Sequence, residues 1–238
     1  MALTDSSTRI RPGEELDAGR IDPYLKAHVA GLVGTPAISQ FPGGASNLTY
    51  LIEYPGKELV LRRPPFGQKA KSAHDMGREF RILNQLSEAF PYCPKAYAHC
   101  TDESLIGSEF YVMERVKGII LRSDLPAELA LGSEQTRALC KSFIDKLVEL
   151  HRVDYNACGL GELGKPQGYV QRQISGWSER YDKALTPDAP RWHAVKDWLQ
   201  ANMPADHPTP AIVHNDYRFD NVILDPAVPM QIIGVLDW

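Results

Sequence analysis

The sequence predicts an α+β fold in two lobes, and three observations support this prediction. Short apolar runs separated by turn residues fill positions 37–63 and recur at 109–115, which is typical of strands. After Gly118 the apolar residues recur three and four apart, which indicates helices. Strand-like runs return from residue 211 onward. We therefore expect a β-rich N-lobe over residues 1–117 and a helical C-lobe over residues 118–238.

The N-lobe is expected to begin with a polar, disordered lead-in over residues 1–13. A helix is predicted over 16–32, because its apolar residues recur mostly three to five apart and Gly31 and Gly34 can end it. Strands are predicted over 37–41, 48–54 and 58–63, with turns at 42–44 and 55–57. A helix over 74–90 and a strand over 109–115 complete this lobe.

The C-lobe is expected to contain a long helix over 133–151, with Ser133 as its N-cap. Leu139, Phe143, Leu147 and Leu150 form its apolar stripe. Two further helices are predicted over 168–183 and 191–202. Short strands over 211–213, 222–224 and 232–236 follow, and turn residues separate them.

Composition limits the classes of protein that fit. The chain has 238 residues, of which 43% are hydrophobic and 24% charged, which disfavours an intrinsically disordered chain. A net charge of −4 does not indicate nucleic-acid binding, and the apolar runs are too short to span a bilayer. The N-terminus lacks an apolar signal segment, and the four cysteines show no C-x-x-C spacing. We expect reduced thiols in a cytoplasmic protein with no membrane and no nucleic-acid partner.

The most specific stretch is His214-x-Asp216, then four residues, then Asn221 ahead of an apolar strand. Asp237 ends the next apolar strand. Phosphoryl transfer needs a carboxylate near the attacking hydroxyl and oxygen ligands for Mg²⁺. A loop followed by a hairpin can supply both, with Asp216 at the hydroxyl and with Asn221 and Asp237 on the metal. An ordinary turn or cap explains an isolated Asp and Asn, but not the whole combination.

These residues resemble the catalytic loop of aminoglycoside phosphotransferases and choline kinases, which are small-molecule relatives of the protein kinases. The resemblance covers almost the whole chain and is closest to the kinase-like domains fused to acyl-CoA dehydrogenases. Asp237-Trp238 is similar to the segment that replaces the protein-kinase motif Asp-Phe-Gly in this family. Asn215 stands at a position where Gly is frequent in the family. His214 is expected to hold the loop backbone. The resemblance implies a protein-kinase-like fold with an N-lobe of strands and a helix and a helical C-lobe.

The resemblance also implies that the fold is C-terminally truncated. Family members usually continue after the second metal ligand with helices that complete the C-lobe and border the acceptor site. We therefore expect an exposed apolar surface around residues 232–238, poor solubility and weak or no activity of the chain as it stands.

The resemblance assigns nucleotide-binding residues to the N-lobe. The loop after the first strand resembles the nucleotide-covering loop, because small residues let backbone N–H groups approach phosphates. Its residues are Gly43, Gly44, Ser46 and Asn47, although Pro-Gly-Gly is more often a simple turn. Two residues of the segment 110–118, Glu114 and Val116, are expected to contact the adenine through backbone atoms, and this stretch also suits a core strand.

Arg62 stands where the family usually has the strand lysine that faces the phosphates. Arginine can bind phosphate through a fork of donors, but the exchange is not conservative. Arg63 takes this place if the register slips by one residue, and a solvated pair on an edge strand is the alternative. Glu79 matches the helix glutamate that pairs with the strand cation, although it also suits a solvated helix surface.

The sequence and the resemblance together predict an ATP-dependent phosphotransferase, with GTP as an alternative donor and Mg²⁺ as cofactor. Its acceptor is a hydroxyl group of a small molecule, such as an aminoglycoside, a hydroxyacyl compound or another hydroxylated metabolite. The C-lobe shows no acidic cluster of the kind that favours a cationic acceptor. A pseudokinase that only binds nucleotide is the first alternative, and a protein kinase is a weaker one. The oligomeric state stays open.

Overall fold

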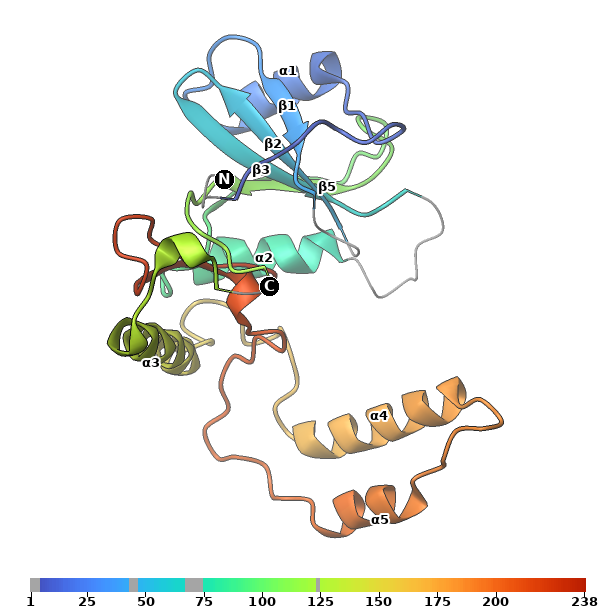
Figure 1. The fold of residues 1–238 in the computed structure, drawn as a ribbon. Coiled ribbons are helices and arrows are strands. Elements are labelled where there is room, and N and C mark those ends of the chain that lie inside the picture. Colours follow the sequence, from blue (N-terminus) through green and yellow to red (C-terminus); the bar gives the residue numbers. More distant parts are fainter. Residues whose placement is uncertain (1–4, 43–46, 67–74, 123–124) are drawn as a thin grey trace.

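The computed structural model describes residues 5–42, 47–66, 75–122 and 125–238 (Figure 1). Its first part is a five-stranded antiparallel sheet in the order β1-β2-β3-β5-β4. The strands are β1 (Ala37–Gln40), β2 (Leu48–Tyr54), β3 (Lys57–Arg63), β4 (Ala96–Cys100) and β5 (Phe110–Glu114). Helix α1 (Ala18–His28) packs on one face of the sheet, and α2 (Met76–Leu86) lies on the other face (Figure 1).

Alternation along β3 and β5 divides their side chains between these two faces. Leu61 and Val112 join the buried cluster beneath α1. Val60 and Tyr111 belong to the cluster that α2 and the second part of the chain share. Since Arg62 follows Val60 by two residues, it lies on the same face, toward the second part of the chain.

The second part is mainly helical. Its helices are α3 (Ser133–His151), α4 (Tyr169–Ala184) and α5 (His193–Ala201), with short 3₁₀ turns η1 (Ala127–Leu129) and η2 (Phe219–Asn221). Strands β6 (Val222–Leu224) and β7 (Ile232–Val235) pair antiparallel. Helices α4 and α5 lie side by side, away from the sheet (Figure 1).

The connection after β5 joins the sheet to the β6–β7 hairpin. Ile119 and Leu224 exchange two backbone hydrogen bonds, of 3.0 and 2.8 Å. A Cβ at Gly118 would lie 2.3 Å from Ile223 Cγ2 and 2.4 Å from the Leu224 carbonyl oxygen. Only glycine fits at this close approach, which holds the hairpin against the sheet. The boundary between the lobes at residues 117 and 118 stays a prediction.

The structure adds one strand that the sequence did not predict and corrects three expectations. Strand β4 was not predicted, because alanine and histidine favour strands weakly and pairing with β5 outweighs that preference. The predicted strand over 211–213 is absent from the described part of the chain, where no neighbouring strand pairs with it. Gly132 rather than Ser133 is the N-cap of α3, and its N–H donates to Gln135 Oε1 at 2.9 Å. Residues 5–8 contact the fold instead of forming a disordered lead-in.

The apolar surface expected around residues 232–238 lies elsewhere. Ile232 and Val235 are buried, because β7 pairs with β6 and packs against α3. The large exposed apolar side chains are concentrated on α4 and α5, where Trp177 is 61% and Trp198 63% exposed. The expectation was wrong because β6 and α3 bury the apolar side chains of β7.

Candidate active site

The loop that precedes β6 brings Asp216 and Asn221 together. The Asn221 side-chain amide donates to Asp216 Oδ2 at 2.9 Å and to the Asp216 carbonyl at 3.0 Å. The two residues are five positions apart in sequence, and the short turn η2 ends at Asn221. Asn215 has φ +68°, a left-handed conformation that asparagine tolerates and glycine adopts freely. This conformation explains why an asparagine can stand where the family often has glycine.

His214 ties this loop to the end of β7. Its Nδ1 accepts from the Asp216 N–H at 3.3 Å, so Nε2 carries the proton and donates to the Leu236 carbonyl at 2.9 Å. Burial lowers the pKa of His214 below its ordinary value of 6.5. The Leu236 carbonyl and the carboxylates of Asp237 and Asp216 raise the pKa, but burial outweighs them. The imidazole is therefore neutral and connects two backbone segments.

The neutral His214 predicts a pH-dependent stability. Below pH 6.5, the ordinary pKa of histidine, the unfolded chain binds a proton that the folded protein does not bind, so the free energy of unfolding decreases. When the pH falls from about 7.5 to about 5.5, we expect the free energy of unfolding to decrease less in His214→Gln than in the unsubstituted protein. Urea unfolding at both pH values checks this expectation. His193→Gln, at an exposed position on α5, is the control and should keep the original pH dependence. An unchanged pH dependence in His214→Gln would contradict the prediction.

Asp237 follows β7 and has φ +66°. The Leu236 N–H donates to the Asn221 carbonyl at 2.8 Å, which fixes this segment beside the loop that holds Asp216. Trp238 Nε1 donates to the Val235 carbonyl at 2.9 Å, and the indole ring packs against Phe90 and His214. These contacts hold the Asp237 carboxylate near Asn221.

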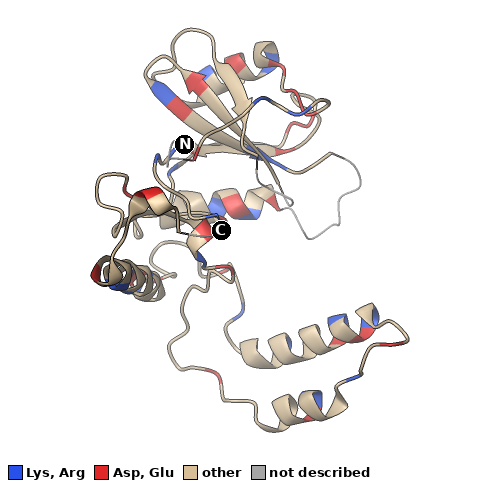
Figure 2. Cartoon of the chain, in the orientation of Figure 1, with Lys and Arg blue, Asp and Glu red and all other residues tan. Residues whose placement is uncertain are grey.

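Arg62 joins the sheet to Asp237. Its Nη2 lies 2.7 Å from Asp237 Oδ1, and its Nη1 lies 3.5 Å from Glu79 Oε2. The Arg62 and Glu79 side chains are only 12% and 13% exposed, so neither is a solvated surface charge. On α2 the charged residues alternate in sign along the helix (Figure 2). Strand β3 lies between β2 and β5, which excludes the edge-strand alternative.

Arg63 points away from this site. It is buried, its Nη1 donates to the Ile106 carbonyl at 2.8 Å, and its guanidinium lies over the Phe66 ring. The period of two along β3 therefore places Arg62, and not Arg63, opposite Asp237.

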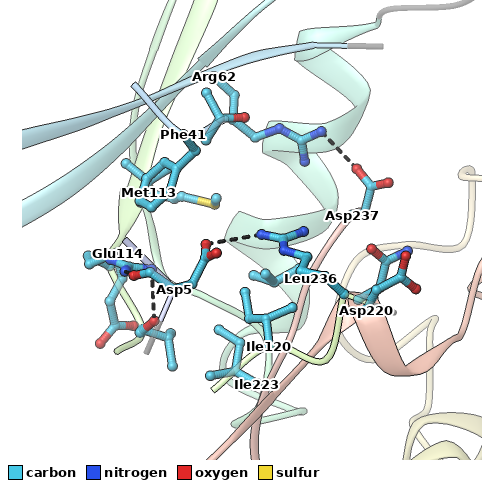
Figure 3. Close-up of a pocket in the computed structure, with 16 residues that line it drawn as sticks. Asp5, Phe41, Arg62, Met113, Glu114, Ile120, Asp220, Ile223, Leu236 and Asp237 are labelled. Carbon is cyan, nitrogen blue, oxygen red and sulfur yellow. Dashed lines mark hydrogen bonds and ion pairs between the residues drawn. The ribbon is translucent and has the colours of Figure 1, made fainter. Parts of the chain in front are cut away.

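A cavity of about 210 Å³ separates the sheet from the β6–β7 hairpin, and Figure 3 shows the side chains around it. The sheet and the segment after it contribute Val60, Arg62, Met113, Glu114 and Val116, and the hairpin contributes Asn221, Ile223, Leu236 and Asp237. Glu114 and Val116 border this cavity, and their expected backbone contacts with adenine stay a prediction. Asp216 does not line this cavity, but its partner Asn221 does.

The other predicted nucleotide residues have different positions. Gly43, Gly44 and Ser46 lie outside the described residues. Asn47 is buried, and its Nδ2 donates to Glu79 Oε1 at 3.1 Å, so it contacts the partner of the strand cation. Its expected role near the phosphates stays a prediction.

Two groups at the site were missed by sequence reasoning. Tyr111 donates to Glu79 Oε2 at 2.9 Å, and pairing β3 with β5 in register would have revealed it beside Arg62. Asp5 lines the cavity and forms an ion pair of 3.0 Å with Arg122, while its carbonyl accepts from Arg115 Nη2 at 2.5 Å. No signal in the sequence indicated Asp5, because residues 5–8 are polar and have no periodicity.

The geometry of the site is typical of one class of protein. The sheet covers a cavity and carries the buried pair of Arg62 and Glu79. Below the sheet lie the loop with Asp216 and Asn221 and the segment after β7 with Asp237. This is the arrangement of a kinase-like phosphotransferase. Among the described residues, no group of three or more His, Cys, Asp or Glu side chains could hold a metal ion.

Comparison with known proteins shows the family. The family model "Phosphotransferase enzyme family" matches residues 37–238, and the chain belongs to this family of small-molecule kinases. Acyl-CoA dehydrogenase family member 11 of Gallus gallus is 35% identical over 244 residues, which cover 100% of this chain and 31% of that protein. The chain thus spans about a third of the curated relatives that it matches.

Solved structures agree with the fold. A crystal structure of a putative aminoglycoside phosphotransferase from Ralstonia eutropha has a TM-score of 0.81 and 34% identity, covering 94% of this chain and 65% of that one. A ternary complex of an aminoglycoside phosphotransferase with streptomycin and ATP has a TM-score of 0.62 and 18% identity, covering 94% of this chain and 70% of that one. The predicted protein-kinase-like fold is therefore confirmed. Within the described residues, no helix is both long and apolar enough to cross a membrane.

Proposed function

We propose that this chain transfers the γ-phosphoryl group of ATP, or alternatively of GTP, to a hydroxyl group of a small molecule. The observation that carries the proposal is that Asn221, Asp237 and Arg62 border the cavity beneath the sheet, while the Asn221 amide binds the Asp216 carboxylate. Family membership supports the same reaction class. ATP as donor is supported by the structural neighbour described as a complex with streptomycin and ATP.

The side chains at the site can support each step of this reaction. The acceptor oxygen forms a bond to the γ-phosphorus, the bond from that phosphorus to the bridging oxygen breaks, and ADP leaves. The hydroxyl proton passes to the Asp216 carboxylate, which Asn221 orients through its hydrogen bond of 2.9 Å. Asn221 and Asp237 offer an amide and a carboxylate as ligands for Mg²⁺, which neutralises phosphate charge when it is bound. Arg62 adds a cation from the sheet side.

A second cavity, of about 640 Å³, supports a site for the acceptor beside the catalytic loop. It is bordered by Asn215, which directly precedes Asp216, and by the cationic side chains of Arg78 and Lys165. Asp206 is the one carboxylate among its described lining residues, and its Oδ2 already accepts from the Gly168 N–H at 2.5 Å. This charge distribution favours a neutral or anionic hydroxylated compound, such as a hydroxyacyl compound, over a cationic aminoglycoside.

Phosphate transfer to acceptors of different charge tests this function. With ATP and Mg²⁺, we expect turnover with an anionic or neutral hydroxy compound and less with an aminoglycoside. Lys165→Glu should lower kcat/KM for an anionic acceptor about fivefold at low salt, leave a neutral polyol unchanged and raise kcat/KM for an aminoglycoside. Lys141→Glu, at an exposed position on α3, is the matched control. Equal effects on all three acceptors would contradict the assignment of this cavity.

The ion pair between Arg62 and Asp237 gives some support to a nucleotide-binding pseudokinase. An arginine that occupies a metal-ligand carboxylate at 2.7 Å competes with a cation for the same oxygen. Such a module would bind ATP without Mg²⁺-dependent turnover on any acceptor. The same transfer assay, combined with direct measurement of ATP binding, distinguishes the two functions.

A further inference from the structure

Tyr111 lies directly beside the strand cation, on the face of the sheet that borders the candidate active site. The register of β3 and β5 pairs Arg62 with Tyr111. Side chains directly opposite each other in an antiparallel pair lie on the same face, with Cβ atoms about 4.5–5.5 Å apart. Tyr111 is buried, and burial is the main cause that raises its pKa above the ordinary value. Its hydroxyl therefore remains a donor.

The Glu79 carboxylate is held mainly by neutral donors. Tyr111 donates to Oε2 at 2.9 Å, and Asn47 donates to Oε1 at 3.1 Å. Arg62 Nη1 is farther from Oε2, at 3.5 Å. The short contact of Arg62 is instead its 2.7 Å bond to Asp237, across the cavity. Glu79 is thus satisfied without drawing the guanidinium toward α2.

Removal of the hydroxyl would change this balance. A carboxylate oxygen that is buried and loses a donor carries a desolvation cost, so it recruits the nearest remaining donor. That donor is Arg62 Nη1, which already lies at 3.5 Å. A guanidinium drawn closer to Glu79 would shift away from Asp237 and from the phosphate side of the cavity.

We propose that Tyr111 is a positioning residue, whose hydroxyl satisfies Glu79 so that Arg62 stays directed at the phosphates and Asp237. This inference rests on the proposed function, and it explains how an arginine serves where the family usually has lysine. A lysine ammonium is a compact point charge that can pair with Glu79 itself, whereas the planar guanidinium spans two carboxylates. The tyrosine hydroxyl thus takes over part of the role that a direct pair with Glu79 would have.

Tyr111→Phe tests the proposal, because it removes only the hydroxyl. We expect the Kd for ATP, measured by calorimetry, and the KM for ATP to rise about tenfold, with kcat changed less than about threefold. Tyr50→Phe is the matched control: Tyr50 is also fully buried, and its hydroxyl donates to the Glu14 carbonyl at 2.8 Å on the opposite face. Tyr50→Phe should alter thermal stability without altering ATP affinity.

The same substitution in an Arg62→Lys background separates positioning from packing. There, Tyr111→Phe should weaken ATP binding less than about threefold, because the lysine can pair directly with Glu79. An equal loss in both backgrounds, or no loss with Arg62, would overturn the proposal.

Crystal structures without nucleotide supply a readout that does not need activity. We expect the shorter contact of Arg62 to be with Asp237 in the unsubstituted protein, as it is here, and with Glu79 in Tyr111→Phe. If the unsubstituted protein binds no nucleotide, the proposed function fails, and the position of Arg62 in these structures still decides the role of Tyr111. An unmoved Arg62 in Tyr111→Phe would refute the inference by itself.

Discussion

Asp216→Asn is expected to lower kcat about 10³-fold while the Kd for ATP changes little. The amide cannot take the hydroxyl proton, but it matches the carboxylate in shape and keeps an oxygen that can accept from Asn221 Nδ2. Asp216 does not line the cavity that we propose for the nucleotide, which is why nucleotide binding should persist. Stopped assays of phosphate transfer and calorimetric titration with ATP measure the two quantities.

The control for this variant removes a carboxylate far from the site. Asp145 lies on α3 and forms an i,i+4 pair with Lys141, so Asp145→Asn changes the net charge equally. Its effect on stability should be a few tenths of a kcal/mol, with turnover unchanged. A folded Asp216→Asn protein that lost turnover and ATP binding to the same degree would refute the assigned role.

Asp237→Asn is expected to lower kcat/KM about 10²-fold or more and to raise the Mg²⁺ concentration needed for half-maximal turnover. Asparagine tolerates the φ of +66° at this position, so the fold should persist. The variant removes the charge that attracts a divalent cation and also the 2.7 Å partner of Arg62. Mg²⁺ titrations of phosphate transfer measure the effect.

Asp220→Asn is the matched control for Asp237→Asn. Asp220 lines the same cavity but forms an ion pair with Arg218. We expect its Mg²⁺ dependence to stay within about threefold of the original value, a change typical of surface substitutions. A larger loss from Asp220→Asn than from Asp237→Asn would move the metal site to Asp220.

Local signals predicted those elements whose patterns are strong. Strand β2 has the predicted bounds, and α3 spans the predicted range 133–151, because alternation and helical spacing are complete in each segment. Strand β4 was missed because its stability comes from pairing with β5, which no local pattern reports. The strand predicted over 211–213 is absent from the described chain for the converse reason, since local propensity without a partner does not make a strand.

The site residues also divide into those that local sequence patterns indicated and those that contacts between distant segments decide. The residue types and spacing of the loop and hairpin, together with the resemblance to the family, indicated Asp216, Asn221 and Asp237, because phosphoryl transfer needs a carboxylate near the hydroxyl and oxygen ligands for Mg²⁺. Their roles remain predictions. The contact between Arg62 and Asp237 joins residues 175 positions apart, and the choice between Arg62 and Arg63 depends on how β3 lies in the sheet.

Side-chain chemistry, short spacings and the resemblance to a known family were enough to predict the reaction class and the order of its parts along the chain. Tertiary structure decided which groups complete the site. The register of β3 and β5 places the Tyr111 hydroxyl against Glu79, and the connection at Gly118 brings the hairpin beneath the sheet. The polar segment at Asp5 reaches the cavity through a partner more than 100 residues away, Arg122. Such contacts follow from sheet pairing and close backbone approach, which act between distant segments and leave no periodic trace in the chain.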